Sequence, residues 1–219
     1  MDLVLITLLG GVLALDATSV GQFMISRPLV AGALTGWLTG DPASGILIGS
    51  LLEIYLLVSF PTGGSRFPEA STATVVAVAV AGTHEGEAAL PVAIAVGLVW
   101  GQIGAWTITG LRRLNGRFVP EPRAAGVAPG VVVRAHLSAI LLDLLRGMAV
   151  TLAGVVVGRW VVTTAAPAWP LAPNATLGLV LAGAAVSAGI LLRSFGGFHR
   201  RRLLFTLGLA LGILGVRLW

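Results

Sequence analysis

The chain has 219 residues, of which 56% are hydrophobic and 11% are charged, and its mean hydropathy is +0.96. A soluble domain carries about 25% charged residues, so the composition excludes an ordinary soluble fold and indicates that much of the surface faces lipid. The absence of cysteine excludes disulfides and thiol catalysis. The net charge of +5 comes mostly from arginines in loops, where they act as signals for membrane orientation instead of nucleic-acid binding.

Apolar segments follow one another along the chain and predict an all-α polytopic integral membrane protein, with residues 1–219 forming a single membrane domain. A spanning helix needs about 20 apolar residues. The segments within residues 1–82 are shorter and are expected to be broken or re-entrant, whereas residues 90–219 hold longer transmembrane helices. The expected helices are 3–14, 29–38, 45–60, 70–82, 90–111, 137–163, 177–192 and 203–219.

Arginine placement predicts the orientation of the second half. The segment 111–134 holds five arginines against one acid, and 193–202 holds four more. Both are expected to be cytoplasmic. The proline-rich, arginine-free segment 166–174 and the segment 83–87 are then expected to be external.

Many of the 30 glycines recur at a spacing of four residues, as at 32/36/40, 45/49, 97/101, 154/158 and 208/212. In lipid, small residues at this spacing let helix backbones approach closely. Tight helix packing is the main expectation, and these faces also suggest assembly with a partner. Glycine also breaks helices and exposes backbone to a ligand, which is compatible with packing.

A polar stretch, residues 15–28, separates the first two short segments and contains Asp16, Gln22, Arg27 and Pro28. Irregular backbone at membrane depth survives only when it is buried in protein or lines a wet cavity. We therefore expect a hairpin tip or an unwound break whose polar side chains face a cavity.

Two further acids lie in or beside the short segments. Glu53, within the third segment, is either a site residue or a partner for an arginine such as Arg27 or Arg66. Residues 60–72 form a second break rich in proline and glycine. Glu69 there is either a ligand-binding acid or a helix-start residue favoured by the helix dipole. The mixture of carboxylates, amide, arginine and free backbone suits sugar hydroxyls.

Other motifs support no enzyme acting alone. Asp143 and Arg146 are three residues apart, which favours an internal ion pair on one helix face. The histidines at 84, 136 and 199 show no metal-site spacing, and no phosphate-binding loop or hydrolase motif is present. The sequence thus indicates no catalytic residue, no metal and no cofactor.

The stretch LDATSVGQFMISRPLVAGALTGWLTGDPASGILIGSLLE, residues 15–53, resembles the IIC subunit of the mannose/fructose/sorbose family of the bacterial phosphotransferase system. The matching features are Asp16, Arg27-Pro28, Gly36, Gly40-Asp41 and the helix 44–53 ending in Glu53. Farther on, His136 and Arg146 match a family helix. The chain departs from the family pattern at Glu69, where aspartate is usual, and at Asp143, where glutamine is usual.

The resemblance implies a sugar-translocating subunit of the bacterial cytoplasmic membrane. Such a subunit pairs with a IID membrane subunit, and cytoplasmic IIB, charged by IIA, phosphorylates the hexose-class sugar. The expected sugar site comprises Asp16, Gln22, Arg27, Glu53, Arg66 and Glu69, with Glu53 and Glu69 accepting hydroxyl hydrogen bonds. Two alternatives are an ion- or proton-coupled secondary transporter and a non-transporting scaffold left by a degraded phosphotransferase set.

Overall fold

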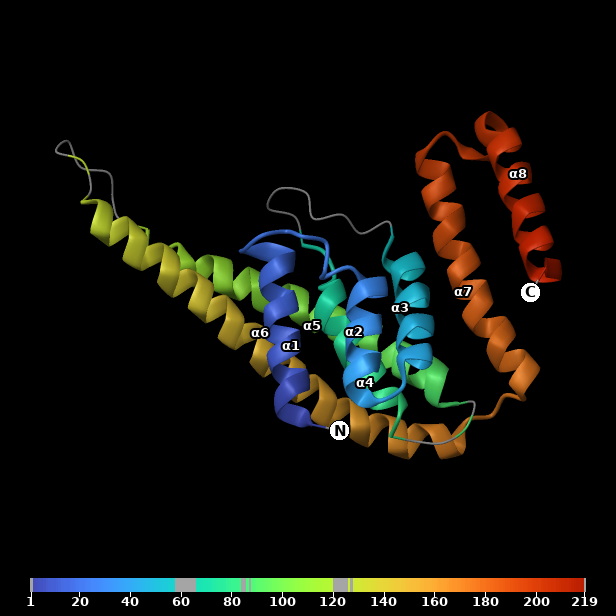
Figure 1. The fold of residues 1–219 in the computed structure, drawn as a ribbon, viewed down its shortest axis with the longest axis horizontal. Coiled ribbons are helices and arrows are strands. Elements are labelled where there is room, and N and C mark those ends of the chain that lie inside the picture. The colour runs from blue at the N-terminus through green and yellow to red at the C-terminus, as the bar shows by residue number, and fades with distance from the viewer. Residues whose placement is uncertain are drawn as a thin grey trace.

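The protein was analysed as a computed structural model, which describes residues 2–57, 66–83, 86, 88–119, 126 and 128–218. The described residues form helices joined by short connections, without strands (Figure 1). The helices are α1 Leu3–Thr18, α2 Pro28–Thr39, α3 Pro42–Leu56, α4 Ala70–Ala81, α5 Ala89–Asn115, α6 Pro129–Ala165, the 3₁₀ turn η1 Ala166–Ala168, α7 Pro173–Ser194 and α8 Gly197–Leu218.

Helix length divides the chain into the two halves that the sequence predicts. Helices α1 to α4 contain 12 to 16 residues. At about 1.5 Å per residue, the shorter ones reach only about 18 Å. Among the residues that the structure describes, three helical segments are long and apolar enough to cross a membrane: Ala89–Asn115, Pro129–Ala168 and Pro173–Ser194. The all-α membrane fold with broken helices is therefore confirmed.

Four helix starts, those of α3, α6, α7 and α8, lie three or more residues before the predicted ones, because hydropathy does not count the polar, glycine and proline residues of a first turn. Helix α3 begins at Pro42 instead of residue 45, since Asp41 accepts a hydrogen bond from the Ser44 backbone N–H at 3.0 Å. Helix α6 begins at Pro129, eight residues before the predicted start. The arginines of the predicted loop 111–134 therefore lie partly on helix ends, and the connection itself spans residues 116–128.

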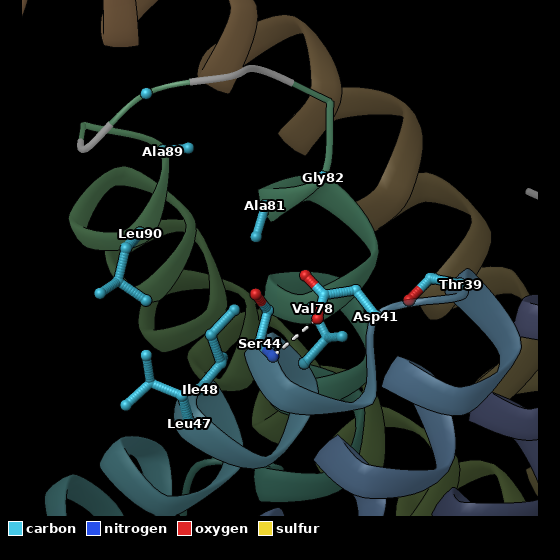
Figure 2. Close-up of a pocket in the computed structure, with 11 residues that line it drawn as sticks. Thr39, Asp41, Ser44, Leu47, Ile48, Val78, Ala81, Gly82, Ala89 and Leu90 are labelled. Carbon is cyan, nitrogen blue, oxygen red and sulfur yellow. Dashed lines mark hydrogen bonds between the residues drawn. The ribbon is translucent and has the colours of Figure 1, made fainter.

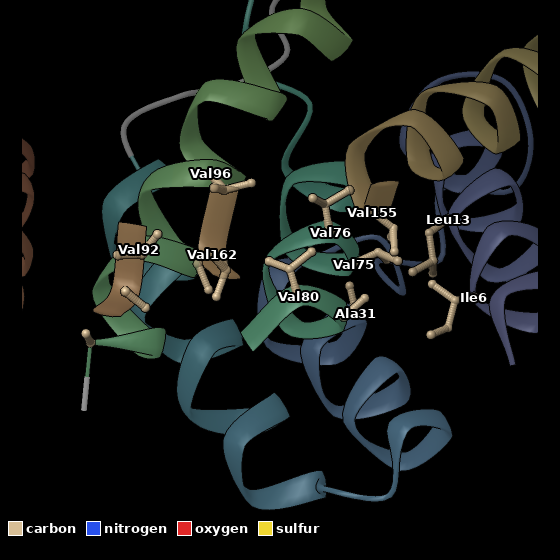
Figure 3. Packing of buried hydrophobic residues seen from close by; sticks show 14 residues of the cluster. Ile6, Leu13, Ala31, Val75, Val76, Val80, Val92, Val96, Val155 and Val162 are labelled. Atoms are coloured by element: carbon tan, nitrogen blue, oxygen red, sulfur yellow. The ribbon is translucent and has the colours of Figure 1, made fainter. Parts of the chain in front are cut away.

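Helix α4 is the centre of the molecule, and residues 71–80 along it are all buried. Its small side chains let the other helices approach closely from several sides. The apolar core lies where α4 meets α1, α2, α5 and α6 (Figure 3). It includes Ile6, Leu13, Ala31, Val75, Val76, Val80, Val92, Val96, Val155 and Val162.

The glycines of α2 and α3 pack these two helices backbone to backbone. A Cβ added at Gly45 would lie 2.4 Å from the Gly32 carbonyl oxygen, and one at Gly36 would lie 2.8 Å from the Gly45 Cα. This confirms tight packing as the role of the 32/36 and 45/49 pairs. These glycine faces are used inside the chain, so they are not free for a partner subunit.

Successive helices run in alternating directions (Figure 1). The C-terminal ends of α1, α3, α5 and α7 lie on one side of the molecule, with the N-terminal ends of the helices that follow them. The α6–α7 connection lies on the other side. The end of α5 and the α7–α8 connection thus lie on one side, and the cytoplasmic location of 111–134 and 193–202 stays a prediction. Residues 84, 85 and 87 of the predicted external segment, and 120–125 and 127 of the arginine-rich one, lie outside the described residues.

Candidate functional site

A polar cavity of about 270 Å³ lies between the α1–α2 connection and the start of α4. Four of the sequence-predicted site residues line it: Asp16, Gln22, Arg27 and Glu69. The other lining residues are Ala17, Met24, Ser26, Pro28, Phe67, Pro68, Ala70 and Ser71. The cavity therefore has two walls: the connection 19–27 with its flanking helix ends, and residues 67–71.

Asp16 shapes the first wall. Its carboxylate accepts hydrogen bonds from the backbone N–H groups of Phe23 at 2.6 Å and Ser26 at 2.9 Å. Within this wall Gln22 and Met24 have φ angles of +55° and +68°. Side-chain-bearing residues rarely adopt such angles, and they persist only where the surroundings impose them, often at ligand sites. Asp16 thus holds the backbone of the predicted break in place.

Glu53 forms an ion pair with Arg27, in which Arg27 Nη2 donates to Glu53 Oε1. Its other oxygen accepts from the Leu29 backbone N–H at 3.3 Å. The side chains of Arg27 and Glu53 are 35% and 22% exposed. This is the arginine-partner alternative for Glu53, and Glu53 itself is not among the residues that line the polar cavity.

Glu69 is fully buried, and Arg146 of α6 holds both of its carboxylate oxygens. Arg146 Nη2 donates to Oε1 at 2.6 Å and Nη1 to Oε2 at 2.9 Å. Thr72 also donates to Oε2, at 3.0 Å. Both carboxylate oxygens of Glu69 are therefore paired within the protein, because a buried charge needs a partner. The predicted role of Glu69 as an acceptor of sugar hydroxyls stays a prediction.

Asp143 completes this group. Its Oδ1 accepts from Arg146 Nε at 2.9 Å, which confirms the predicted internal ion pair. Its Oδ2 accepts from the hydroxyls of Thr18, at 2.5 Å, and Ser19 at the end of α1. The sequence did not reveal the Glu69–Arg146 contact, since 77 residues separate the two and no spacing rule links them.

Two serines that line the cavity were not predicted from the sequence. Ser26 and Ser71 both line it. Ser71 is 1% exposed, and its Oγ has no hydrogen-bond partner in the described part of the chain. A buried hydroxyl without a partner costs free energy, which a bound polar ligand recovers. The only sequence signal was its place directly after the proline-rich break.

The remaining predicted features lie elsewhere. Arg66 is exposed and does not line the cavity. Residues 58–65, most of the second break, lie outside the described residues, as does His84. His136 and His199 are exposed and far apart in the chain. No group of potential metal ligands occurs among the residues that the structure describes.

A second cavity, of about 320 Å³, lies at the C-terminal ends of α2 and α4, away from the polar cavity (Figure 2). Its lining includes Thr39, Asp41 and Ser44, and the rest is mostly apolar. Asp41 points its carboxylate at the start of α3, where hydrogen bonds from Ser44 lower the pKa of Asp41. Because the one carboxylate among its described lining residues serves as a helix cap, this cavity is less suited to a polyhydroxylated ligand.

A third cavity, about 630 Å³, lies between α3, α5, α6 and α7. It is lined almost wholly by apolar side chains, including Trp100 and Trp169, with the Tyr55 hydroxyl bonded to the Val180 carbonyl at 2.6 Å. Its walls match lipid chains better than a sugar.

Comparison with known proteins assigns the chain to a family. The family model for the sorbose-specific IIC component of the phosphotransferase system matches residues 1–194, most of the chain. The chain belongs to this family of IIC components. A curated relative, the sorbose-specific EIIC component of Lacticaseibacillus casei, is 27% identical over 77 residues, which are 34% of this chain and 28% of that protein.

Solved structures resemble this IIC component in fold. A structure described only as a membrane protein has a TM-score of 0.71 and 21% identity, and the match covers 99% of this chain and 92% of the other. The cryo-electron microscopy structure of the mannose transporter ManYZ with microcin E492 has a TM-score of 0.64 and 22% identity, with the same coverage. These matches and the long apolar helices identify a multi-pass membrane protein.

Proposed function

We propose that this IIC component binds a hexose-class sugar in the polar cavity and carries it across the bacterial cytoplasmic membrane for phosphorylation by a separate IIB subunit. The observation that carries the proposal is that Ser71, whose buried hydroxyl has no hydrogen-bond partner among the described residues, lines the same cavity as Asp16, Gln22 and Arg27. A sugar hydroxyl, which both donates and accepts, suits this set of groups. The cavity is close to the lower limit, about 300 Å³, of small-molecule sites.

The proposed residues divide into two kinds. Gln22, Arg27 and Ser71 contact the sugar, together with the backbone that Asp16 holds in place. Glu53 orients Arg27 through their ion pair. Glu69 forms the second wall, and Arg66 stands at its edge, one residue before Phe67.

The proposed assembly follows from the family and from the short helices. Helices of 12 residues need protein around them to lie within a bilayer. A IID-type membrane subunit is the proposed neighbour, a proposal supported by the family of IIC components and by the similar fold of the mannose transporter ManYZ. Phosphoryl transfer is assigned to cytoplasmic IIB, recharged by IIA, because the chain belongs to the family of IIC components of the phosphotransferase system.

Ser71→Ala tests the sugar site. The Ser71 hydroxyl has no hydrogen-bond partner among the described residues, so its removal leaves folding intact, while the sugar loses one hydrogen bond. We expect the affinity for the sugar to fall roughly two- to tenfold. The measurement is binding of radiolabelled mannose and sorbose to the protein co-purified with its IID-type partner.

The matched control is Thr151→Val. Thr151 also has a buried hydroxyl without a partner in the described residues, but it packs on Gly10 away from the cavity. Its replacement should leave affinity unchanged. Equal affinities for the parent protein and Ser71→Ala would remove this cavity from the sugar path. Accumulation of unphosphorylated sugar driven by an ion gradient, without IIB, would favour secondary transport instead.

A further inference from the structure

Three buried charges connect the two walls of the polar cavity. Arg146 binds Glu69 in the second wall and Asp143 on its own helix. Asp143 in turn accepts hydrogen bonds from Thr18 and Ser19, where α1 ends and the first wall begins. The exposed fractions of the Arg146, Glu69 and Asp143 side chains are 9%, 0% and 2%. Solvent therefore cannot substitute for these contacts.

The geometry restricts each member of this group. Arg146 uses its planar fork on Glu69 while its Nε binds Asp143 and its Nη1 also reaches the Thr107 hydroxyl at 3.0 Å. The Glu69 backbone N–H donates to the Gly101 carbonyl of α5 at 2.9 Å. Fork-shaped arginine contacts fix both distance and angle, unlike the contacts of a lysine.

Gly104 of α5 provides the space that the Glu69 carboxylate occupies. A Cβ added at Gly104 would lie 2.4 Å from Glu69 Oε2 and 2.8 Å from the Glu69 Cβ. Any side chain at this position therefore displaces Glu69. In contrast, a Cβ at Gly110 on the same helix would meet nothing within 4 Å.

We infer that Arg146 and Asp143 are positioning residues that hold the two walls of the polar cavity at the separation that binds sugar. Helix α6 thereby sets the width of the cavity without touching the sugar. The link to sugar binding rests on the proposed function, but the separation of the two walls can be measured without any sugar.

The chain has no cysteine, so spin labels attach only to cysteines that are introduced. Two introduced cysteines therefore allow the distance between the two walls to be measured. Phe23 in the first wall and Arg66 beside the second are both exposed, and Phe23→Cys with Arg66→Cys accepts a pair of spin labels. Distances between the labels are measured by pulsed electron paramagnetic resonance on the complex in lipid nanodiscs. Binding of radiolabelled mannose and sorbose is measured on the matching proteins without cysteines.

Arg146→Lys separates positioning from charge neutralisation. Lysine keeps the positive charge, so the protein still inserts and assembles, but it cannot hold Glu69 and Asp143 with one rigid fork. We expect the distance between the labels to shift or broaden and sugar affinity to fall roughly ten- to a hundredfold. An unchanged distance would overturn the inference, because it would show that charge alone suffices.

Gly104→Ala gives a second test that keeps every charge. We expect it to change the label distance as Arg146→Lys does, while Gly110→Ala leaves the distance of the parent protein. Identical distances for Gly104→Ala and Gly110→Ala would also overturn the inference. Failure of the parent protein to bind either sugar would count against the proposed function alone, since the distances would still decide the role of Arg146.

Discussion

At the residue scale, each buried or half-buried acid of the candidate site has a specific partner. Asp16 accepts backbone N–H groups, Glu53 pairs with Arg27, and Glu69 and Asp143 share Arg146. Arg146 thus joins two buried acids into one group of charged side chains.

The Arg27–Glu53 pair gives a prediction at this scale. Glu53→Gln leaves Arg27 without its carboxylate, and because the pair is partly exposed we expect a loss of roughly 1–3 kcal/mol in stability. Adding Arg27→Gln should recover most of this stability, but not the affinity for sugar. Thermal unfolding and sugar binding on the same preparations provide the measurements. A double variant less stable than Glu53→Gln would contradict this account.

At the element scale, the hairpin of α2 and α3 depends on glycine because its two backbones touch. Gly45 lies against the backbone of Gly32 and Gly36, so a methyl group there would meet atoms that cannot rotate away. The hairpin also carries Arg27 and Glu53 at its two ends, next to the polar cavity. Its packing therefore affects the site as well as stability.

Gly45→Ala is expected to destabilise the protein by roughly 1–3 kcal/mol, as overpacking does in other tightly packed interiors. The matched control is Gly189→Ala in α7, where an added Cβ meets nothing within 4 Å. There the better helix propensity of alanine should leave stability unchanged or raise it by up to about 1 kcal/mol. Thermal unfolding followed by tryptophan fluorescence in detergent compares the two. Equal effects would argue against close contact between the hairpin backbones.

At the scale of the whole molecule, charge placement and helix direction agree. Arg27 occupies the N-cap position of α2, and arginines lie in the last turns of α5 and α7. These helix ends face one side of the molecule (Figure 1). The α6–α7 connection on the other side lacks arginine. From the positive-inside rule we propose that the walls of the polar cavity lie toward the cytoplasm, on the side of the proposed IIB partner.

Single cysteines test this orientation directly. In intact cells, a membrane-impermeant maleimide should label Pro170→Cys, whereas Arg117→Cys and Phe195→Cys should react only after permeabilisation. All three positions are described by the structure, and the parent chain contributes no background thiol. Labelling of Arg117→Cys and Pro170→Cys from the same side would contradict the topology.

The sequence by itself determined the class of the molecule and much of the first wall. The low fraction of charged residues showed that the protein lies in lipid, and the short apolar segments showed that some helices are broken. The polar residues 16, 22 and 27 marked one break correctly. Hydropathy and polarity can be read from neighbouring residues alone, so these features needed no tertiary structure. The roles of Glu53 and Glu69 stayed open, since spacing cannot show which arginine a buried acid meets. Only the tertiary structure brought Glu69 to Arg146, across 77 residues and into the space left by Gly104. A buried ion pair depends on where helices cross, and helix crossing is decided by the packing of the whole bundle.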